Sequence, residues 1–367
     1  MRIALPLIAA ALAATLAPLP AQASSYKDFR DWWAACDNLR NCSAYGFDTE
    51  MSGGTYLRIE RGGAPDAQPE ITVTTDVGEG VTFRLSFDDP ALPGLPADLL
   101  QSEEGEGHGL RRAQIGAGQG ETLIASLRKA KQLIVTRVDP PGRKSDPVVS
   151  RVSLNGAVAA LLWIDDQQKR LGTTTALIRR GDKPASTIPP QPTAPAIIPA
   201  NGLTGDAADK KPSPRDEAAV KKKGLQLCGE GDKGEFDSAT ALSADTWLYG
   251  FRCPDSSGAY NFAYTFLIAK AGQSQSARAA QFRWPVKIGD AQNDAGNDAF
   301  VINADFSNAD MTMRTFSKGR GIGDCGTEQS WVFDGKAFRL AELKMMANCK
   351  GVPADDWPTL YRADVKK

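Results

Sequence analysis

The sequence predicts a mainly β protein of the α+β class, in which a proline-rich linker joins two antiparallel β domains. Segments that alternate apolar and polar residues recur along the chain, and this alternation is the period of a half-buried strand. Helical patterns are confined to two segments of the first half, so the first domain carries one or two helices. Residues 182–223 hold eight prolines among small and charged residues, which is typical of a semi-extended linker. We therefore expect domains at 24–181 and 224–367, which suits a chain of 367 residues.

The first 23 residues have the three parts of a secretory signal peptide. Arg2 supplies the positive start, Ile3 to Leu16 the apolar middle, and Ala21-Gln22-Ala23 the small-x-small pattern that signal peptidase needs. The alternative is a transmembrane anchor, but the apolar run is shorter than the ~20 residues that span a bilayer. We expect cleavage after Ala23, export to the periplasm and no transmembrane segment.

Six cysteines in an exported protein predict a disulfide framework. Although six cysteines allow 15 pairings, their order along the chain favours three local ones. These are Cys36–Cys42 in the first domain, and Cys228–Cys253 and Cys325–Cys349 in the second. With no bridge across the linker, each domain is expected to be a separate, self-contained unit. A metal site is the rival use of cysteine, but no C-x-x-C occurs and His108 is the one histidine, so we expect no metal and no cofactor.

Strands in the first domain are predicted where β-branched and aromatic residues alternate or cluster, over residues 56–59, 71–74, 81–87, 133–136 and 175–178. Residues 31–36 and 42–47 flank a short turn and predict a hairpin that its own disulfide closes.

Two helices are predicted in the first domain, over residues 122–131 and 153–171. For the second helix, Ser153 is a candidate N-cap and Gly172 a candidate terminator, and its apolar first half predicts burial against a sheet. Its last turn carries Asp165 and Asp166. Adjacent carboxylates could serve acid/base chemistry, but we favour surface ion pairs of Asp165 with Lys169 and of Asp166 with Arg170, because that spacing suits a solvated helix face.

Hairpins dominate the predicted second domain, over residues 247–268, 300–316 and 331–340. In the last one, Asp334-Gly335 indicates a two-residue turn. That register pairs Trp331 with Phe338 and Phe333 with Lys336. Trp331, Phe333, Phe338 and Leu340 then share one apolar face that must be covered, so the hairpin belongs to a packed sheet.

Several motifs together resemble a known family. They are Asp31-Trp-Trp-Ala-Ala-Cys with Cys42-Ser-Ala-Tyr-Gly, Ser153-Leu-Asn-Gly-Ala, Lys318-Gly-Arg-Gly-Ile-Gly-Asp-Cys-Gly, Trp331-Val-Phe-Asp-Gly-Lys, Cys349-Lys-Gly-Val-Pro and Asp356-Trp-Pro. The chain resembles the six-cysteine exported bacterial family known as domain of unknown function number 1176, over nearly all of its length except the linker. Its first domain is also similar, more weakly, to the invasion-associated locus B family, which implies a small β-rich exported domain. Neither resemblance implies catalytic residues.

The glycine-rich segment 318–326 is the candidate ligand site. Its four glycines let backbone amides approach a ligand, and Lys318, Arg320 and Asp324 place charge beside them. No G-K-[ST] follows, so it is no phosphate loop. The competing interpretation, which we favour, is that the glycines shape the approach of the chain to the Cys325 disulfide.

Other candidates for chemistry are weaker. His108 lies in a glycine-rich stretch, which is typical of a surface loop. Ser126 and Lys129 match S-x-x-K but lack the companion motifs of that enzyme class. Five acidic and amide residues could bind calcium, although their spacing fits no EF-hand loop and a polar turn is the simpler interpretation. They are Asp290, Asn293, Asp294, Asn297 and Asp298.

The leading functional hypothesis is a non-enzymatic periplasmic protein that binds an envelope protein or a ligand. It depends on the absence of catalytic motifs, and the net charge of −1 gives no field for nucleic acid. One alternative is an envelope hydrolase whose carboxylates are distant in sequence and converge in the fold. Another is a purely structural or stress-related envelope protein.

Overall fold

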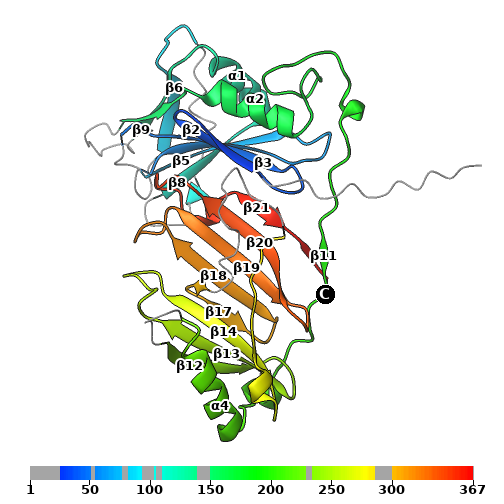
Figure 1. Cartoon of the computed structure of the whole chain (residues 1–367). Coiled ribbons are helices and arrows are strands. Elements are labelled where there is room, and N and C mark those ends of the chain that lie inside the picture. The colour runs from blue at the N-terminus through cyan, green and yellow to red at the C-terminus, as the bar shows by residue number, and fades with distance from the viewer. Residues whose placement is uncertain are drawn as a thin grey trace, which may run out of the picture.

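A computed structural model describes residues 25–50, 54–76, 82–92, 103–104, 110–138, 149–228, 234–285 and 300–366. The protein is mainly β, as the sequence predicts, with several antiparallel sheets and few helices. Figure 1 shows a first unit of blue and cyan strands under two helices, stacked on a second unit of yellow to red strands. Within these residues no helix has the length and apolar character needed to cross a membrane. The predicted signal peptide, His108 and the acidic segment 290–298 lie outside the described residues.

A seven-stranded antiparallel sheet forms the centre of the first unit, in the order β1-β2-β3-β4-β5-β8-β7. Its strands are β1 (Ser25–Phe29), β2 (Trp32–Cys36), β3 (Cys42–Phe47), β4 (Tyr56–Arg61), β5 (Pro69–Asp76), β7 (Glu103–Glu104) and β8 (Leu110–Ile115). A smaller sheet holds β10 (Val149–Ser153), β9 (Gln132–Val138) and β6 (Thr82–Phe87). The predicted hairpin is confirmed, because β2 pairs with β3 and places Cys36 opposite Cys42.

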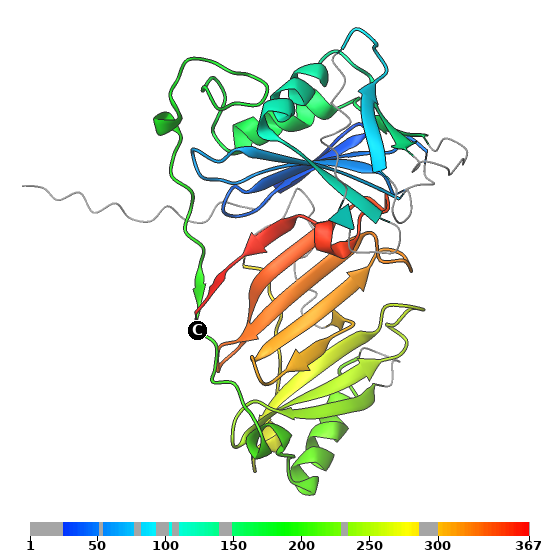
Figure 2. The ribbon, with the colours of Figure 1, turned by 180° about the vertical axis from the view of Figure 1, so that it is seen from behind.

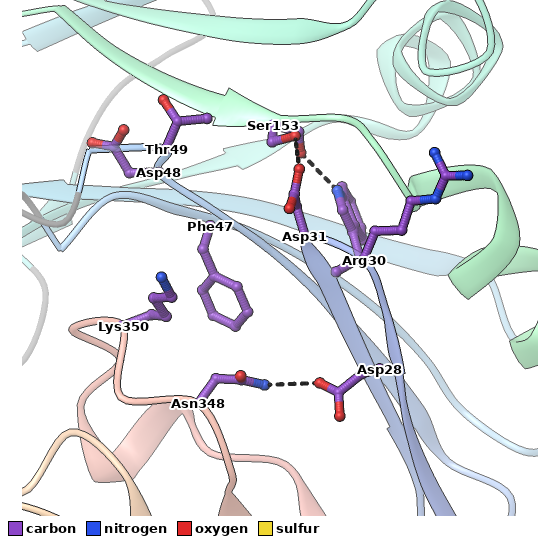
Figure 3. A pocket seen from close by; sticks show the side chains of 10 residues that line it. Asp28, Arg30, Asp31, Phe47, Asp48, Thr49, Ser153, Asn348 and Lys350 are labelled. Carbon is purple, nitrogen blue, oxygen red and sulfur yellow. Dashed lines mark hydrogen bonds between the residues drawn. The ribbon is translucent and has the colours of Figure 1, made fainter.

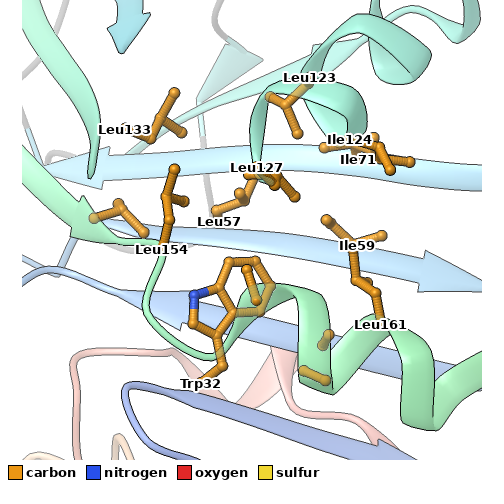
Figure 4. Packing of buried hydrophobic residues seen from close by; sticks show 14 of the residues in the cluster. Trp32, Leu57, Ile59, Ile71, Leu123, Ile124, Leu127, Leu133, Leu154 and Leu161 are labelled. Atoms are coloured by element: carbon orange, nitrogen blue, oxygen red, sulfur yellow. The ribbon is translucent and has the colours of Figure 1, made fainter. Parts of the chain in front are cut away.

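One face of the seven-stranded sheet packs under α1 (Ala117–Ser126) and α2 (Ala157–Gln167). Trp32, Leu57, Ile59 and Ile71 from the strands meet Leu123 and Leu161 from the helices (Figure 4). The predicted burial of the second helix against a sheet is confirmed. Its start differs from the prediction, since Ser153 ends β10 and Gly156 precedes the helix at φ 109°. Glycine is needed there because a Cβ would lie 1.7 Å from the carbonyl oxygen of Phe29.

The opposite face of the same sheet is buried too, because side chains alternate along a strand. Trp33, Tyr45, Phe47 and Tyr56 belong to one hydrophobic cluster with Val352, Trp357 and Leu360 of the second unit. This corrects the expectation of two self-contained domains, since the two units share a core. The sheet is therefore covered by helices on one face and by the second unit on the other.

Two sheets form the second unit. The first contains β12 (Glu235–Ala241), β13 (Thr246–Cys253), β14 (Ala263–Lys270), β15 (Arg278–Ala279) and β16 (Val301–Ile302). The second contains β17 (Asp305–Ser307), β18 (Thr312–Lys318), β19 (Gly326–Phe333), β20 (Phe338–Met346) and β21 (Thr359–Arg362). Helix α4 (Pro214–Gly224) covers β13, where Val220 contacts the cluster of Trp247, Tyr249 and Phe251. The short helix η4 (Ala354–Asp356) precedes β21.

The predicted hairpin 331–340 exists with a different register. Phe333 pairs with Phe338 and Trp331 with Leu340, so residues 334–337 form a four-residue turn. Asp334 closes it by accepting from the amides of Lys336 and Ala337 (2.8 and 2.7 Å). A shift by two residues keeps every side chain on its face. All four predicted apolar residues therefore reach the shared core.

The segment 182–223 follows the surface of both units (Figure 2). Arg40 donates to the carbonyl of Pro189 (3.0 Å), which attaches the beginning of the segment to the first unit. Further along, β11 (Ala196–Ile197) pairs in parallel with β22 (Asp364–Val365), which attaches it to the second unit. The C-terminal part of the predicted linker forms nearly all of α4, with Ser213 as the N-cap residue that accepts from the amide of Asp216.

Three disulfides join the cysteines in the predicted pairs, Cys36–Cys42, Cys228–Cys253 and Cys325–Cys349. Each lies within one unit.

The carboxylate of Asp165 is buried, which makes the predicted surface pair with Lys169 wrong. It accepts from Arg61 (2.7 Å) and from the amides of Leu177 and Ile178 (both 2.9 Å). The predicted strand 175–178 is absent for the same reason, because these amides bind a side chain and not a neighbouring strand. Arg170 is also buried and donates to the carbonyls of Ala64 and Pro65 (2.5 and 2.9 Å), so its predicted pair with Asp166 is wrong too.

We predict that Asp165→Asn lowers the free energy of unfolding by about 3 kcal/mol, because Arg61 then stays buried without a counter-charge. The matched control is the exposed neighbour Asp166→Asn, which should change it by less than about 0.5 kcal/mol. Urea denaturation measures both. Equal stability of the two variants would contradict the buried network.

Candidate functional site

The glycine-rich segment 318–326 is the turn between β18 and β19. Arg320 binds Asp324 through two hydrogen bonds (2.6 and 2.5 Å), and the amide of Gly351 donates to the same carboxylate (2.7 Å). Burial alone would raise the pKa of Asp324, but these hydrogen bonds outweigh it and hold the pKa below its ordinary value. Both carboxylate oxygens are thus used within the protein, and Asp324 connects this turn to the loop after Cys349.

The glycines of this turn fit closely around the disulfide. A Cβ on Gly319 would lie 2.6 Å from the sulfur of Cys325, and Gly326 adopts φ 134° with the carbonyl of Ser317 2.0 Å from a Cβ. The predicted shaping of the approach to Cys325 accounts for these two positions. Asp324 also lies close to the sulfurs of Cys325 and Cys349. These two sulfurs form a disulfide, so neither is a thiolate that could bind a metal.

Asp356 forms the main polar contact between the two units. Its buried carboxylate accepts from Arg58 on β4 (2.9 Å), from Arg112 on β8 (2.5 Å to each oxygen) and from the hydroxyl of Tyr56. Tyr45 donates to its backbone carbonyl (2.6 Å). Burial, followed by the charge of Asp356, raises the pKa of Tyr56, so this phenol is a neutral donor.

In a second contact across the same junction, the first unit supplies the carboxylate and the second unit supplies the arginine. Asp37, in the turn that the Cys36–Cys42 disulfide closes, accepts from Arg362 at the end of β21 (2.7 Å). The side chain of Asn38 donates to the backbone carbonyl of Arg362 (3.0 Å) and accepts from the backbone amide of Arg362 (2.9 Å). It thus makes the two hydrogen bonds that the backbone of a neighbouring strand would make. Burial raises the pKa of Asp37 in spite of its hydrogen bond from Asn41 and the charge of Arg362.

A cavity of about 300 Å³ lies at this junction and is lined by both units. The first unit contributes the turn between β1 and β2, the end of β3 and the end of β10. The second unit contributes the loop next to the Cys325–Cys349 disulfide. The lining residues are Asp28, Arg30, Asp31, Trp32, Phe47, Asp48, Thr49, Ser153, Asn348 and Lys350. In Figure 3, Asp48 and Thr49 lie above Phe47, Asn348 and Asp28 lie below it, and Lys350 lies beside it.

Each of the three carboxylates in this cavity is fixed through one oxygen. Asp28 accepts from Asn348 (3.4 Å), Asp31 accepts from Ser153 (2.6 Å), and Asp48 accepts from the amide of Glu50 (3.0 Å). Within the described part of the chain, the second oxygen of each has no hydrogen bond, and no ion pair joins the three to a cation. The cavity therefore presents oriented acceptors toward a molecule that enters it.

Comparison with known proteins identifies the family. A family model described as "Protein of unknown function (DUF1176)" matches residues 26–364. The chain belongs to the DUF1176 family. The resemblance that the sequence motifs indicate is confirmed.

This DUF1176 chain is 29% identical over 355 residues to "Uncharacterized protein YpfG" of Escherichia coli (strain K12), covering 92% of the chain and 93% of that protein. A crystal structure of invasion associated protein b from Bartonella henselae matches 39% of the chain and 98% of its own length. The identity is 17% and the TM-score is 0.28.

The junction residues of this DUF1176 chain were not predicted as a site. One signal is present in Trp32-Trp-Ala-Ala-Cys, a strand in which every residue is buried, because continuous apolar runs indicate a sheet covered on both faces. A second signal is the motif Asp356-Trp-Pro, whose aspartate accepts from Arg58 and Arg112. The predicted site residues lie apart from the cavity, except that Asp324 holds Gly351 beside Lys350.

We predict that Asp324→Asn destabilises the protein at neutral pH and that the difference from wild type disappears in acid. Because the pKa of Asp324 is lowered on folding, its contribution is complete above the unfolded pKa, about 3.9, and is lost as the pH falls through the folded value. Urea denaturation between pH 7 and pH 3 measures this. Asp355→Asn, which removes an exposed carboxylate of the same unit, should show no such pH dependence. A constant difference at every pH would contradict this role.

Proposed function

We propose that this protein is an exported, non-enzymatic binding protein of the periplasm, which takes a small polar ligand in the cavity between its two units. The observation that carries the proposal is the arrangement of Asp28, Asp31 and Asp48, each fixed through one oxygen and free to accept through the other. A ligand held there contacts both units at once. Binding would therefore also stabilise the junction, since a ligand that binds only the folded state stabilises it.

The lining favours a ligand rich in hydrogen-bond donors. Three carboxylates and the hydroxyl of Thr49 can accept, while Arg30 and Lys350, one from each unit, supply donors. A volume of about 300 Å³ is at the lower end for small-molecule pockets. We therefore infer a compact ligand that carries an ammonium group and several hydroxyls, such as an amino sugar.

Ion pairing of the buried carboxylates supports binding over hydrolysis. A carboxyl that acts as general acid must be held protonated. The four buried aspartates of the described residues each accept from an arginine and have both oxygens occupied by protein donors, so none is open to protonate a leaving group. These pairs are Asp37–Arg362, Asp165–Arg61, Asp324–Arg320 and Asp356–Arg58. Burial raises the pKa of Asp37, yet both its oxygens are occupied by Asn41, Leu39 and Arg362.

Export is supported by two features. Three disulfides suit an oxidising compartment outside the cytoplasm. The N-terminal sequence has the pattern of a signal peptide, with cleavage expected after Ala23.

The test uses glucosamine as the probe and isothermal titration calorimetry as the readout. We predict that glucosamine binds and that glucose, which lacks the ammonium group, binds at least about tenfold more weakly, since a charge-assisted hydrogen bond contributes about 1.5–3 kcal/mol. Asp28→Asn and Asp48→Asn should each weaken the binding of glucosamine by a similar factor. Asp66→Asn, an exposed carboxylate away from the cavity, is the control. Unchanged binding in both cavity variants, or no preference for glucosamine over glucose, would refute the proposed site.

A further inference from the structure

Exposed apolar side chains gather at one edge of the second unit. Six large hydrophobic residues of the described chain are exposed, and three of them are Tyr260 (39%), Phe262 (36%) and Ile322 (76%). Tyr260 and Phe262 precede β14, and Ile322 lies in the turn between β18 and β19. A Cβ on Gly321 would lie 3.5 Å from the ring of Tyr260, so the two loops touch. Both turns leave the sheets at the same edge in Figures 1 and 2.

Hydrogen bonds fix these two loops to one another. Asn261 donates to the carbonyl of Lys318 (2.8 Å) and accepts from its amide (3.0 Å). Asn303 donates to the carbonyls of Tyr260 and Phe316 (3.0 and 2.8 Å) and accepts from the amide of Phe262 (2.9 Å). The Cys325–Cys349 disulfide holds the base of the turn. These contacts hold the turn in a conformation in which Ile322 is exposed.

Cationic side chains surround this apolar group. The guanidinium of Arg252 lies 4.5 Å from the ring centroid of Phe262, and the ammonium of Lys318 lies 5.5 Å from that of Phe316. Arg320 has 47% of its side chain exposed. Its partner Asp324 is buried and fully used by protein donors, so it faces the interior. We name Tyr260, Phe262, Ile322, Lys318 and Arg320 together the apolar tip.

We propose that the apolar tip docks the protein on the anionic surface of a lipid bilayer, with Ile322 entering the boundary between headgroups and acyl chains. Aromatic residues favour that boundary, and Lys and Arg beside them are attracted to anionic lipids. A protein partner fits less well, because a stable protein interface buries about 800 Å² on each side. Three side chains on two turns are far too few for that.

The test is flotation of the full protein with lipid vesicles. We expect it to float with vesicles of phosphatidylethanolamine and phosphatidylglycerol and not with vesicles of phosphatidylethanolamine and phosphatidylcholine. Ile322→Asp should abolish flotation. Lys318→Gln should weaken vesicle binding about fivefold, because one basic residue near an anionic surface contributes about that factor.

The matched control is Ile198→Asp, since Ile198 is equally exposed (75%) but lies away from the tip, beside β11. It should float as wild type does. Thermal unfolding checks that the variants remain folded, and changes at such exposed positions should leave it nearly unchanged. Failure of the wild type to float, equal flotation with both lipid mixtures, or an equal effect of Ile322→Asp and Ile198→Asp would overturn the proposal.

Discussion

Asp356 brings a carboxylate from the second unit onto a face of the first unit that carries Arg58, Arg112 and the hydroxyl of Tyr56. Without this anion, Arg112 would lose the carboxylate that it binds, and Arg58 would be left with Glu60. Buried ion pairs contribute little net stability, because desolvation offsets their attraction, whereas removal of one partner is costly. The favourable free energy of the junction comes from apolar surface, at about 25 cal/mol per Å² buried. We infer that Asp356 selects the orientation in which that surface is covered.

The disulfides act on this junction although none of them crosses it. Cys36–Cys42 closes the turn that presents Asp37 and Asn38 to β21. Cys325–Cys349 fixes the loop that carries Asn348 and Lys350 into the cavity. The same disulfide braces the turn that exposes Ile322, so the cavity and the apolar tip are attached to one cross-link.

Local features of the fold could be predicted from the sequence, and contacts between distant segments could not. The alternation around Phe83, the hairpin at Cys36 and Cys42 and the three disulfides depend on neighbours in sequence. The junction depends on pairs such as Arg112 and Asp356, which are 244 residues apart. Asp165 was misassigned because Lys169 stands four residues away at helical spacing, whereas folding brings the buried Arg61, 104 residues away in sequence, to 2.7 Å from its carboxylate. The cavity lining is drawn from four separate segments, so no single sequence motif predicts it.

The two units form one body through their shared core and not through the covalent linker. A protease site inserted after Thr193 separates the part of the linker that binds the first unit from the part that binds the second. Because every disulfide lies within one fragment, only non-covalent contacts then hold the fragments together. Gel filtration of the cleaved protein should give a single species with the mass of the intact chain, and Asp356→Asn should release the fragments while Asp355→Asn does not. Two separate fragments from the cleaved wild-type protein would contradict the account.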